Sequence, residues 1–595
     1  MKTFTILFFI FHLNGQAQII HVPADYPTIQ EGIAAAHTSD TVLVADGLYY
    51  ENIDFLGKKP LMVASHFLMD SDTNHINNTI INGSQPANPD IGSVVLFISG
   101  EDTTSVLCGF TITGGSGLLI SEVPFRGGGG AFISSGAKLL NNHFIYNEVI
   151  DNVRTNGGAI WGGSPYFPDA IVVLRNNRIS HNKAMSYGDE GDGGGFDLFC
   201  NVILENNEIS HNEANGPYRG DGGGGRIIAN SPTQVTVKNN QIINNRAISV
   251  SAETDLVLSG GLDFWGDCRG VVSGNNISFN EAEVPVSGGW CYGTGVLVEL
   301  DGVKDPDFLF ENNIVSQNTF SGEYCVGGGI CVFTSGGKFQ NNIIQNNEGT
   351  HGGGIAIEYN TDTNQVIMIN NTLAGNTGTW GGGMYIESGN VLVINSIIWG
   401  NQAQWSPSIY PYQQSTLEVV YSDVESDDVW PGDGNISEDP GFLDDDLHIG
   451  ENSPCEDMGT EDYYFADSWY YAPEFDFEGT PRPYDDEFDI GADECNIITR
   501  LPDLSNDDSS PVMIRIYPNP TPLRSEIKYQ ISKSKSVVVK VLDMQGSEIS
   551  TLVNEDQAPG EHTVSLDASS LPAGIYLVRL EAGEAITTNK LVVMR

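Results

Sequence analysis

The segments NNRISHN (176–182), NNEISHN (206–212) and NNQIINN (239–245) are three of nine copies of a seven-residue motif. The remaining copies are NNHFIYN (141–147), GNNISFN (274–280), NNIVSQN (312–318), NNIIQNN (341–347), NNTLAGN (370–376) and NSIIWGN (395–401). The final asparagines of successive copies are 25 to 38 residues apart. A period of this size indicates one supersecondary unit that is stacked many times.

Most repeat units also contain a glycine run followed by an apolar stretch, as in GGGFDLF (193–199) and GGGICVF (327–333). Glycine and asparagine are poor helix residues. The short β-branched runs VIMI (366–369) and VLVI (391–394) are typical of strands. One coil of three short strands and three turns takes roughly 25 residues. The repeat therefore predicts an all-β fold, a parallel β-helix solenoid over residues 18–420.

The asparagines have a physical role in such a fold. Asn tolerates the left-handed backbone conformation that tight turns require. Equivalent Asn side chains in stacked coils lie about 4.8 Å apart, which is the spacing between strands. We therefore expect their amides to form hydrogen bonds along the stack. The Ile or Leu at the third or fourth position of each motif is expected to point into the core.

The N-terminal segments VPADYPTIQEGI (22–33) and DTVLVADGLYYENI (40–53) closely resemble the opening of secreted β-helix proteins of the pectin-lyase-like superfamily. This resemblance covers roughly residues 20–420 and implies a right-handed solenoid. It carries over no catalytic residue, because the chain contains no known lyase or galacturonase motif. Ile29, Ile33 and Ala36 have helical spacing, and we expect this short helix to cap the open end of the solenoid.

Residues 1–17 have the pattern of a secretory signal peptide. Lys2 precedes the apolar run TILFFIFHL, and small residues follow at Gly15 and Ala17. This run is too short to anchor the mature protein in a bilayer. No other stretch reaches the ~18 apolar residues of a transmembrane helix. The mature protein is therefore expected to have no membrane span.

An acidic segment over residues 421–499 follows the repeats. Residues 421–495 hold 25 Asp or Glu residues and only one Arg or Lys, Arg482. The phrases EDPGFLDDD (438–446) and DIGADE (489–494) look like the segment that closes bacterial surface β-helix proteins. Cys455 and Cys495 bracket this segment, and we expect them to form a disulfide.

The linker RLPDLSNDDSSP (500–511) separates this segment from residues 512–595, which have the alternating strand pattern of a small β-sandwich. These last residues resemble the C-terminal sorting domain of the type IX secretion system. The matching features are YPNP (517–520), LDMQG (542–546), LPAGIY (571–576) and the terminal KLVVMR. The resemblance implies that type IX machinery is a partner. It also implies export through the periplasm to the outer cell surface or the medium.

The formal net charge of −50 excludes binding to a nucleic-acid backbone, which needs a basic surface. It keeps the chain soluble, and we expect a monomer. Acidic clusters suit Ca²⁺, which prefers oxygen ligands. The eight cysteines fit an oxidising compartment. Besides Cys455/Cys495, the pairs Cys325/Cys331 and Cys268/Cys291 are disulfide candidates, although connectivity cannot be read from sequence.

Two consecutive units carry reactive side chains at equivalent positions. They read RISHNKAMSYGDEGDGGGFDLF (178–199) and EISHNEANGPYRGDGGGGRII (208–228). His181 and His211 occupy one repeat position, and Asp192 and Asp221 each precede a glycine run directly. Stacking of the coils would place each pair side by side. The same two loops also carry Tyr187, Asp189, Glu190, Tyr218 and Arg219.

These residues allow two interpretations. As a carbohydrate site, the catalytic candidates are Asp192, Asp221, His181, His211 and Arg219. A Ca²⁺ site would use Asp189, Glu190, Asp192 and Asp221. Alternatively, they are solvated turn residues that recur because the coil recurs.

We expect an exported glycan-binding or adhesive surface protein rather than an enzyme. The alternative is an extracellular polysaccharide lyase or glycoside hydrolase that acts on uronate-containing or other polysaccharides. The fold alone cannot decide between these functions. Exposed Trp161, Trp265, Trp290 and Trp399 are further candidates for stacking against sugars.

Overall fold

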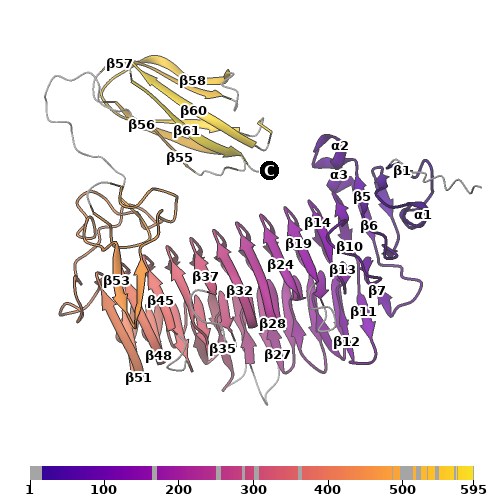
Figure 1. Cartoon of the computed structure of the whole chain (residues 1–595), viewed down its shortest axis with the longest axis horizontal. Helices are drawn as coiled ribbons and strands as arrows, with labels where there is room; N and C mark the ends of the chain where they lie inside the picture. Colours follow the sequence, from indigo (N-terminus) through magenta and orange to yellow (C-terminus); the bar gives the residue numbers. More distant parts are fainter. Residues whose placement is uncertain are drawn as a thin grey trace, which may run out of the picture. The chain divides into compact units, whose positions relative to one another are not determined.

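The computed structural model describes residues 17–593, with gaps at 164–169, 250–255, 285–287, 301–306, 360–364, 485–486, 496–513, 518–520, 522–523, 532–533, 543–547, 569–570, 573 and 584. The predicted signal peptide (apart from Ala17), the linker and parts of the sorting motifs therefore lie outside the described residues. The chain divides into two compact units, Met1–Ile497 and Ile498–Arg595 (Figure 1). Among the helices of the described residues, none combines the length and apolar character needed to cross a bilayer.

The first unit is the predicted parallel β-helix, whose coils contribute strands to four large sheets of 22, 13, nine and six strands. The coil that contains Asp192 consists of β19 (Ile171–Arg175), β20 (Arg178–Ser180), β21 (Lys183–Ser186), β22 (Gly191–Asp192) and β23 (Phe196–Phe199). The next strand, β24 (Asn201–Glu205), pairs with β19 and begins the next coil. Pairing between coils in these sheets is parallel, except where β11 pairs with β7 and β12. The repeat therefore determines the all-β fold class as expected (Figure 1).

Two groups of strands carry the candidate site that is described below. They are the nine-stranded sheet and those strands of the 22-stranded sheet that follow the glycine runs. The nine-stranded sheet contains β7 (Ile91–Gly92), β11 (Gly117–Ile120), β12 (Phe125–Gly127), β17 (Arg154–Asn156), β22, β27 (Arg219–Asp221), β31 (Leu256–Leu258), β35 (Trp290–Tyr292) and β40 (Tyr324–Val326). The strands that follow the glycine runs include β13 (Ala131–Ile133), β18 (Ile160–Gly163), β23, β28 (Gly225–Lys238), β32 (Leu262–Ser273), β36 (Val296–Glu299), β41 (Ile330–Phe333), β44 (Ile355–Glu358) and β48 (Met384–Ile394).

Asparagine ladders run along the stack, as the motif predicts. Asn182 shows the pattern: its backbone N–H and its side-chain Nδ2 both donate to Oδ1 of Asn212 in the next coil, at 3.0 and 2.9 Å. Its Nδ2 also donates to the carbonyl of Phe144 in the preceding coil, at 2.9 Å. One ladder joins the second residue of the motifs and the other joins the seventh. The first residue of most motifs, such as Asn176 with φ 55°, takes the left-handed conformation instead.

The motif isoleucines fill the solenoid core. Ile179, Ile209 and Ile242 are fully buried and lie in register on consecutive strands of the 13-stranded sheet. At the N-terminal end, α1 (Ile29–Ala35) begins after Thr28, whose side chain accepts a hydrogen bond from the backbone of Glu31 at 3.1 Å. The helix buries Ile29 and Ile33 against the first coils. Two short helices that the sequence did not predict are α2 (Phe67–Asp70) and α3 (Asn74–Asn78).

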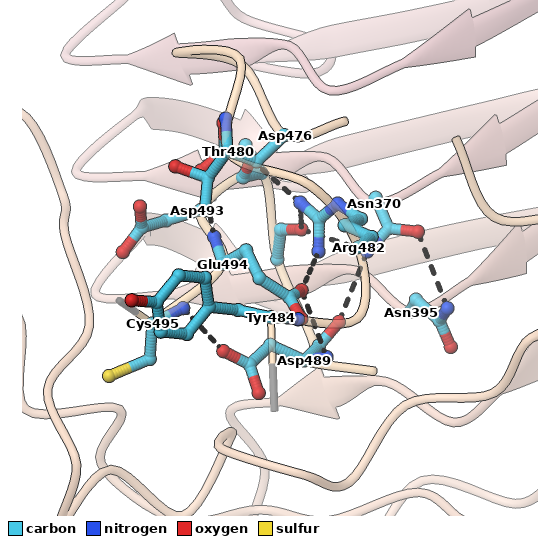
Figure 2. A network of polar contacts seen from close by, with 12 residues as sticks. Asn370, Asn395, Asp476, Thr480, Arg482, Tyr484, Asp489, Asp493, Glu494 and Cys495 are labelled. Carbon is cyan, nitrogen blue, oxygen red and sulfur yellow. Dashed lines mark hydrogen bonds and ion pairs between the residues drawn. The ribbon is translucent and has the colours of Figure 1, made fainter. Parts of the chain in front are cut away.

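The acidic segment packs against the last coils of the solenoid and contains a buried ion pair of its own. Nη1 of Arg482 lies 2.7 Å from Oε2 of Glu494, and both side chains are fully buried (Figure 2). The Arg482 guanidinium also donates to the carbonyls of Gly491 and Ala492. On the solenoid side, Nδ2 of Asn370 donates to the carbonyls of Asp489 and Gly491. The left-handed asparagines of the last coils therefore hold this segment in place.

The second unit contains two antiparallel sheets. The first holds β55 (Ile514–Tyr517), β56 (Arg524–Ile531) and β59 (Gly560–Asp567), and the second holds β57 (Lys535–Leu542), β58 (Glu548–Gln557), β60 (Gly574–Ala582) and β61 (Ala585–Val593). Val539, Val578 and Leu591 are among the fully buried side chains of its own core. This is the small β-sandwich that the sequence predicts.

Candidate functional site

The glycine runs bend each coil sharply, and the bend brings two rows of outward-facing side chains together. Gly193 has φ 61°, and a Cβ atom on Gly194 would lie only 2.4 Å from the carbonyl oxygen of Gly223 in the next coil. Only glycine fits this backbone approach. We call the outward-facing residues of the nine-stranded sheet, and of the strands that follow the glycine runs, the bend face.

A cluster of buried charges occupies the middle of the bend face. Asp192 and Asp221 lie in register on the neighbouring strands β22 and β27, and both are fully buried. Across the bend, Arg226 on β28 contacts both of them, with distances of 2.9 Å to Asp192 and 3.1 Å to Asp221. Arg226 also forms a bidentate pair with Asp197 on β23. A single buried guanidinium thus joins carboxylates from three strands.

Two further arginines surround this cluster. Arg154 on β17 lies 2.5 Å from Asp192, and Arg219 on β27 lies 2.8 Å from Asp221. Both also contact Glu190, at 3.1 and 3.3 Å. Because these pairs are desolvated and share partners, removal of one member leaves a buried charge without compensation.

The two stacked aspartates have opposite pKa shifts. Burial disfavours ionisation of Asp192, but Arg226 and Arg154 outweigh it and lower the pKa of that carboxyl. For Asp221, burial dominates over the attraction of Arg219, and with repulsion from Asp192 it raises the pKa to about 7. The pair therefore holds one firmly ionised carboxylate and one carboxyl that titrates near neutral pH.

Asp263 on β32 lies one coil further along the stack, in register with Arg226, and its carboxyl also faces outward. Burial, and then repulsion from Asp221, raise its pKa well above the ordinary value. Among the described residues, its Oδ1 atom is buried and has no hydrogen-bond partner. Burial therefore favours the protonated form of Asp263, and one of its carboxyl oxygens has no hydrogen-bond partner among the described residues.

A cavity of about 280 Å³ opens beside these carboxyls. Its polar lining comes from Arg219, Asp221, Arg226, Asp263 and Glu299. Its apolar lining comes from Leu256, Leu258, Trp265, Tyr292, Leu297 and Phe333. Such a mixture of aromatic faces and convergent polar groups is typical of small-molecule sites.

A row of aromatic side chains continues from the cavity along the following coils. Ring centroids lie 5.5 Å apart for Tyr292 and Phe333, across the bend. Stacked pairs on adjacent coils are Trp290/Tyr324, His351/Trp380 and Tyr385/Tyr410, with centroids 4.8, 4.7 and 5.9 Å apart. This row lies outside the main solenoid core.

The two candidate histidines lie at another corner of the coil. His181 and His211 stack on each other with centroids 4.8 Å apart, as the repeat predicts. Both occupy left-handed turns between the 13-stranded and six-stranded sheets, and both are exposed. The charged groups that act on His181 are Arg178, Glu208 and His211, and none of the cavity carboxyls is among them. Of the five catalytic candidates, Asp192, Asp221 and Arg219 therefore lie in the charge cluster around Arg226, whereas the two histidines contact each other elsewhere on the coil.

The four carboxylates predicted for Ca²⁺ differ in their surroundings. Asp189 is exposed, and Glu190, Asp192 and Asp221 are paired with arginines. In the described part of the chain, no group of three or more His, Cys, Asp or Glu side chains is arranged to hold a metal ion. Guanidinium groups neutralise these acids. The sequence pattern did not reveal this, because Arg154 lies in the preceding unit and Arg226 contacts the aspartates across the glycine bend.

Asp197, Arg226 and Asp263 were not among the residues predicted from the sequence. Each occupies the second position of the strand after its glycine run, as in GGGFDLF, GGGGRII and GGLDF. Alternation along a strand makes this position outward-facing, so a charged residue there is a usable signal. The four tryptophans predicted to be exposed differ in burial. Trp265 and Trp290 are 44% and 37% exposed on the bend face. Trp161 is buried, and Trp399 packs beside the acidic segment.

All eight cysteines are buried, and the described structure contains no disulfide bond between them. Cys268 lies in the main core and Cys331 lies on the bend face, whereas Cys291 and Cys325 share a third cluster. These clusters favour neither Cys268/Cys291 nor Cys325/Cys331, and both pairings stay predictions. Cys455 and Cys495 lie in one buried cluster of the acidic segment, and their disulfide stays a prediction.

Replacement of Glu358 by glutamine is expected to stabilise the protein at alkaline pH. Glu358 on β44 is buried, and burial followed by the charge of Glu387 raises its pKa to about 8 from an ordinary value of 4.5. The folded state therefore keeps a proton that the unfolded state loses, so this group's contribution to stability falls as pH rises from 4.5 to 8. The gain on substitution is on the order of 3 kcal/mol at pH 9 and small at pH 4.

Thermal unfolding at these two pH values measures the effect. The exposed Glu148→Gln is the matched control and should change neither midpoint. Equal midpoint shifts for Glu358→Gln at both pH values would contradict the assignment.

Comparison with known proteins identifies the second unit. Residues 515–594 match the family model of a secretion system C-terminal sorting domain. The type IX sorting domain predicted from the motifs is thus confirmed, and the protein is exported to the outer cell surface by this machinery. No pectin-lyase-like family model matches the solenoid. Neither the curated proteins nor the solved structures contain a match to the chain.

Proposed function

We propose that this surface protein binds a glycan chain on the bend face, with one sugar residue in the cavity. The observation that carries the proposal is the 280 Å³ cavity that combines the faces of Trp265, Tyr292 and Phe333 with the charged groups of Arg219 and Glu299. Sugar rings present apolar C–H faces that pack on aromatic rings, and hydroxyl groups that bond to carboxyl and guanidinium groups. The site therefore suits a carbohydrate better than a purely apolar ligand.

The aromatic row supports a chain rather than a single sugar. His351/Trp380 and Tyr385/Tyr410 continue the surface on coils that follow the cavity. Successive coils are spaced by about 4.8 Å, so further rings are available along the stack. Export to the outer surface is also consistent with a polymer that cannot enter the cell.

The test is binding of the purified protein to neutral and uronate oligosaccharides by calorimetry. Trp265→Ala should weaken binding by roughly five- to 150-fold, because a ring stacked on an aromatic side chain gains roughly 1–3 kcal/mol. Trp469→Ala removes an indole of similar exposure, 55%, on the hairpin of β53 (Asp462–Phe465) and β54 (Ser468–Tyr471), and should bind normally. Absence of binding to both glycan classes, or equal loss in both variants, would contradict the proposal.

A glycoside hydrolase is the second candidate, and the two unlike carboxyls of the cavity favour it. Burial favours the protonated form of Asp263, which suits it to act as general acid, while Asp221, whose pKa is raised to about 7, is suited to act as base. Asp263→Asn would then abolish the release of reducing ends but preserve binding. Bound glycan that stays intact in the wild-type protein would leave binding as the function.

A further inference from the structure

Cys291 and Cys325 lie in register on the neighbouring parallel strands β35 and β40. Their sulfur atoms are 3.2 Å apart, and both side chains are buried. Parallel strands place paired Cα atoms about 4.8 Å apart, within the range of about 4.4–6.8 Å that disulfides span. The sulfurs need to approach by only roughly 1 Å to reach bonding distance.

The surroundings of this pair are apolar. Ala247, Val257, Ala282 and Val284 form the cluster with the two cysteines. The Thr294 hydroxyl contacts both sulfurs, at 3.4 and 3.3 Å. Burial, and then contact with Cys291, raise the pKa of the Cys325 thiol well above its ordinary value. In the folded protein this thiol is therefore a poor nucleophile and a poor metal ligand.

We propose that Cys291 and Cys325 form a disulfide between coils in the exported protein, independently of glycan binding. One thiolate attacks a disulfide-bearing oxidant and forms a mixed disulfide, and the second thiolate then displaces the reduced oxidant. The two cysteines lose two electrons and two protons in total, and the oxidant disulfide becomes two thiols. Because the folded thiols are buried, the exchange takes place before these two coils close.

The bond would fix the position of β35 relative to β40 on the bend face. Trp290 and Tyr292 flank Cys291, and Tyr324 precedes Cys325. Trp290 stacks on Tyr324 across the same two strands, and Tyr292 lines the cavity. A link between the strands therefore fixes the spacing of the rings on which this aromatic surface depends.

Mass spectrometry of the full-length exported protein tests the proposal. The protein is unfolded without reductant, alkylated with N-ethylmaleimide and digested. We expect a linked peptide that contains Cys291 and Cys325, whereas Cys200, Cys268 and Cys331 carry the label. Recovery of both Cys291 and Cys325 in labelled form, with the three control cysteines equally labelled, would overturn the proposal.

Thermal unfolding provides a second readout. Because the link closes a loop between residues 34 apart in sequence, reduction should lower the wild-type midpoint by several degrees. The double variant Cys291→Ala/Cys325→Ala should start at a lower midpoint and respond less to reductant than the wild type does. The same response to reductant in the variant and the wild type would assign the effect to other cysteines and contradict the proposal.

Discussion

Replacing Arg226 by methionine is expected to lower the free energy of unfolding by on the order of 4 kcal/mol at neutral pH. Arg226 is buried and bonds to Asp192, Asp197 and Asp221. Methionine fills much of the volume but leaves these carboxylates without their shared cation. The cost of a buried uncompensated charge exceeds the cost of the lost packing.

The loss should be larger at pH 8 than at pH 5. In the wild-type protein, burial works against ionisation of Asp192, and Arg226 and Arg154 keep its pKa low. Without Arg226, burial raises the pKa values of the remaining carboxyls. The folded state then binds protons that the unfolded state has lost, so stability falls as pH rises. Urea unfolding followed by tryptophan fluorescence at the two pH values measures this.

Arg175→Met is the matched control for this experiment. Arg175 lies 2.6 Å from Glu205, but its side chain is 41% exposed. Such a surface pair contributes about 0–1 kcal/mol, so the control should unfold almost as the wild type does. If Arg226→Met had an equally small effect, the cluster would not depend on this guanidinium.

Removing residues 512–595 is expected to abolish display at the outer surface while leaving the solenoid folded. The sorting domain carries the type IX match, and it has its own hydrophobic core. The solenoid core is a separate cluster built from its own coils, so its folding does not need the removed residues. The truncated protein should accumulate in the periplasm, as measured by surface proteolysis of intact cells and by fractionation.

Two point substitutions test whether display requires the sorting domain to be folded, and not only to be present. Val539→Asp places a charge at a fully buried position and should also prevent display. Ile549→Ala changes a side chain that is 41% exposed and should leave display intact. Normal surface levels of the truncated protein, or loss of the solenoid's cooperative unfolding, would assign another role to the C-terminal domain.

The sequence by itself determined the features that repeat. A motif that recurs once per coil places equivalent residues in register, so the stacking of Asp192 on Asp221 and of His181 on His211 follows from spacing alone. The asparagine ladders follow for the same reason. The type IX sorting domain was also readable, because its motifs are local.

The tertiary structure decided which stacked rows of side chains meet across the bend at the glycine runs. The histidines and Asp192 are close in sequence, but β21 separates them within the coil. Arg226 reaches Asp192 because the glycine run turns the chain back toward the preceding strand. Repetition fixes contacts along the stack, whereas contacts within a coil depend on the angle of each turn, which local sequence does not specify.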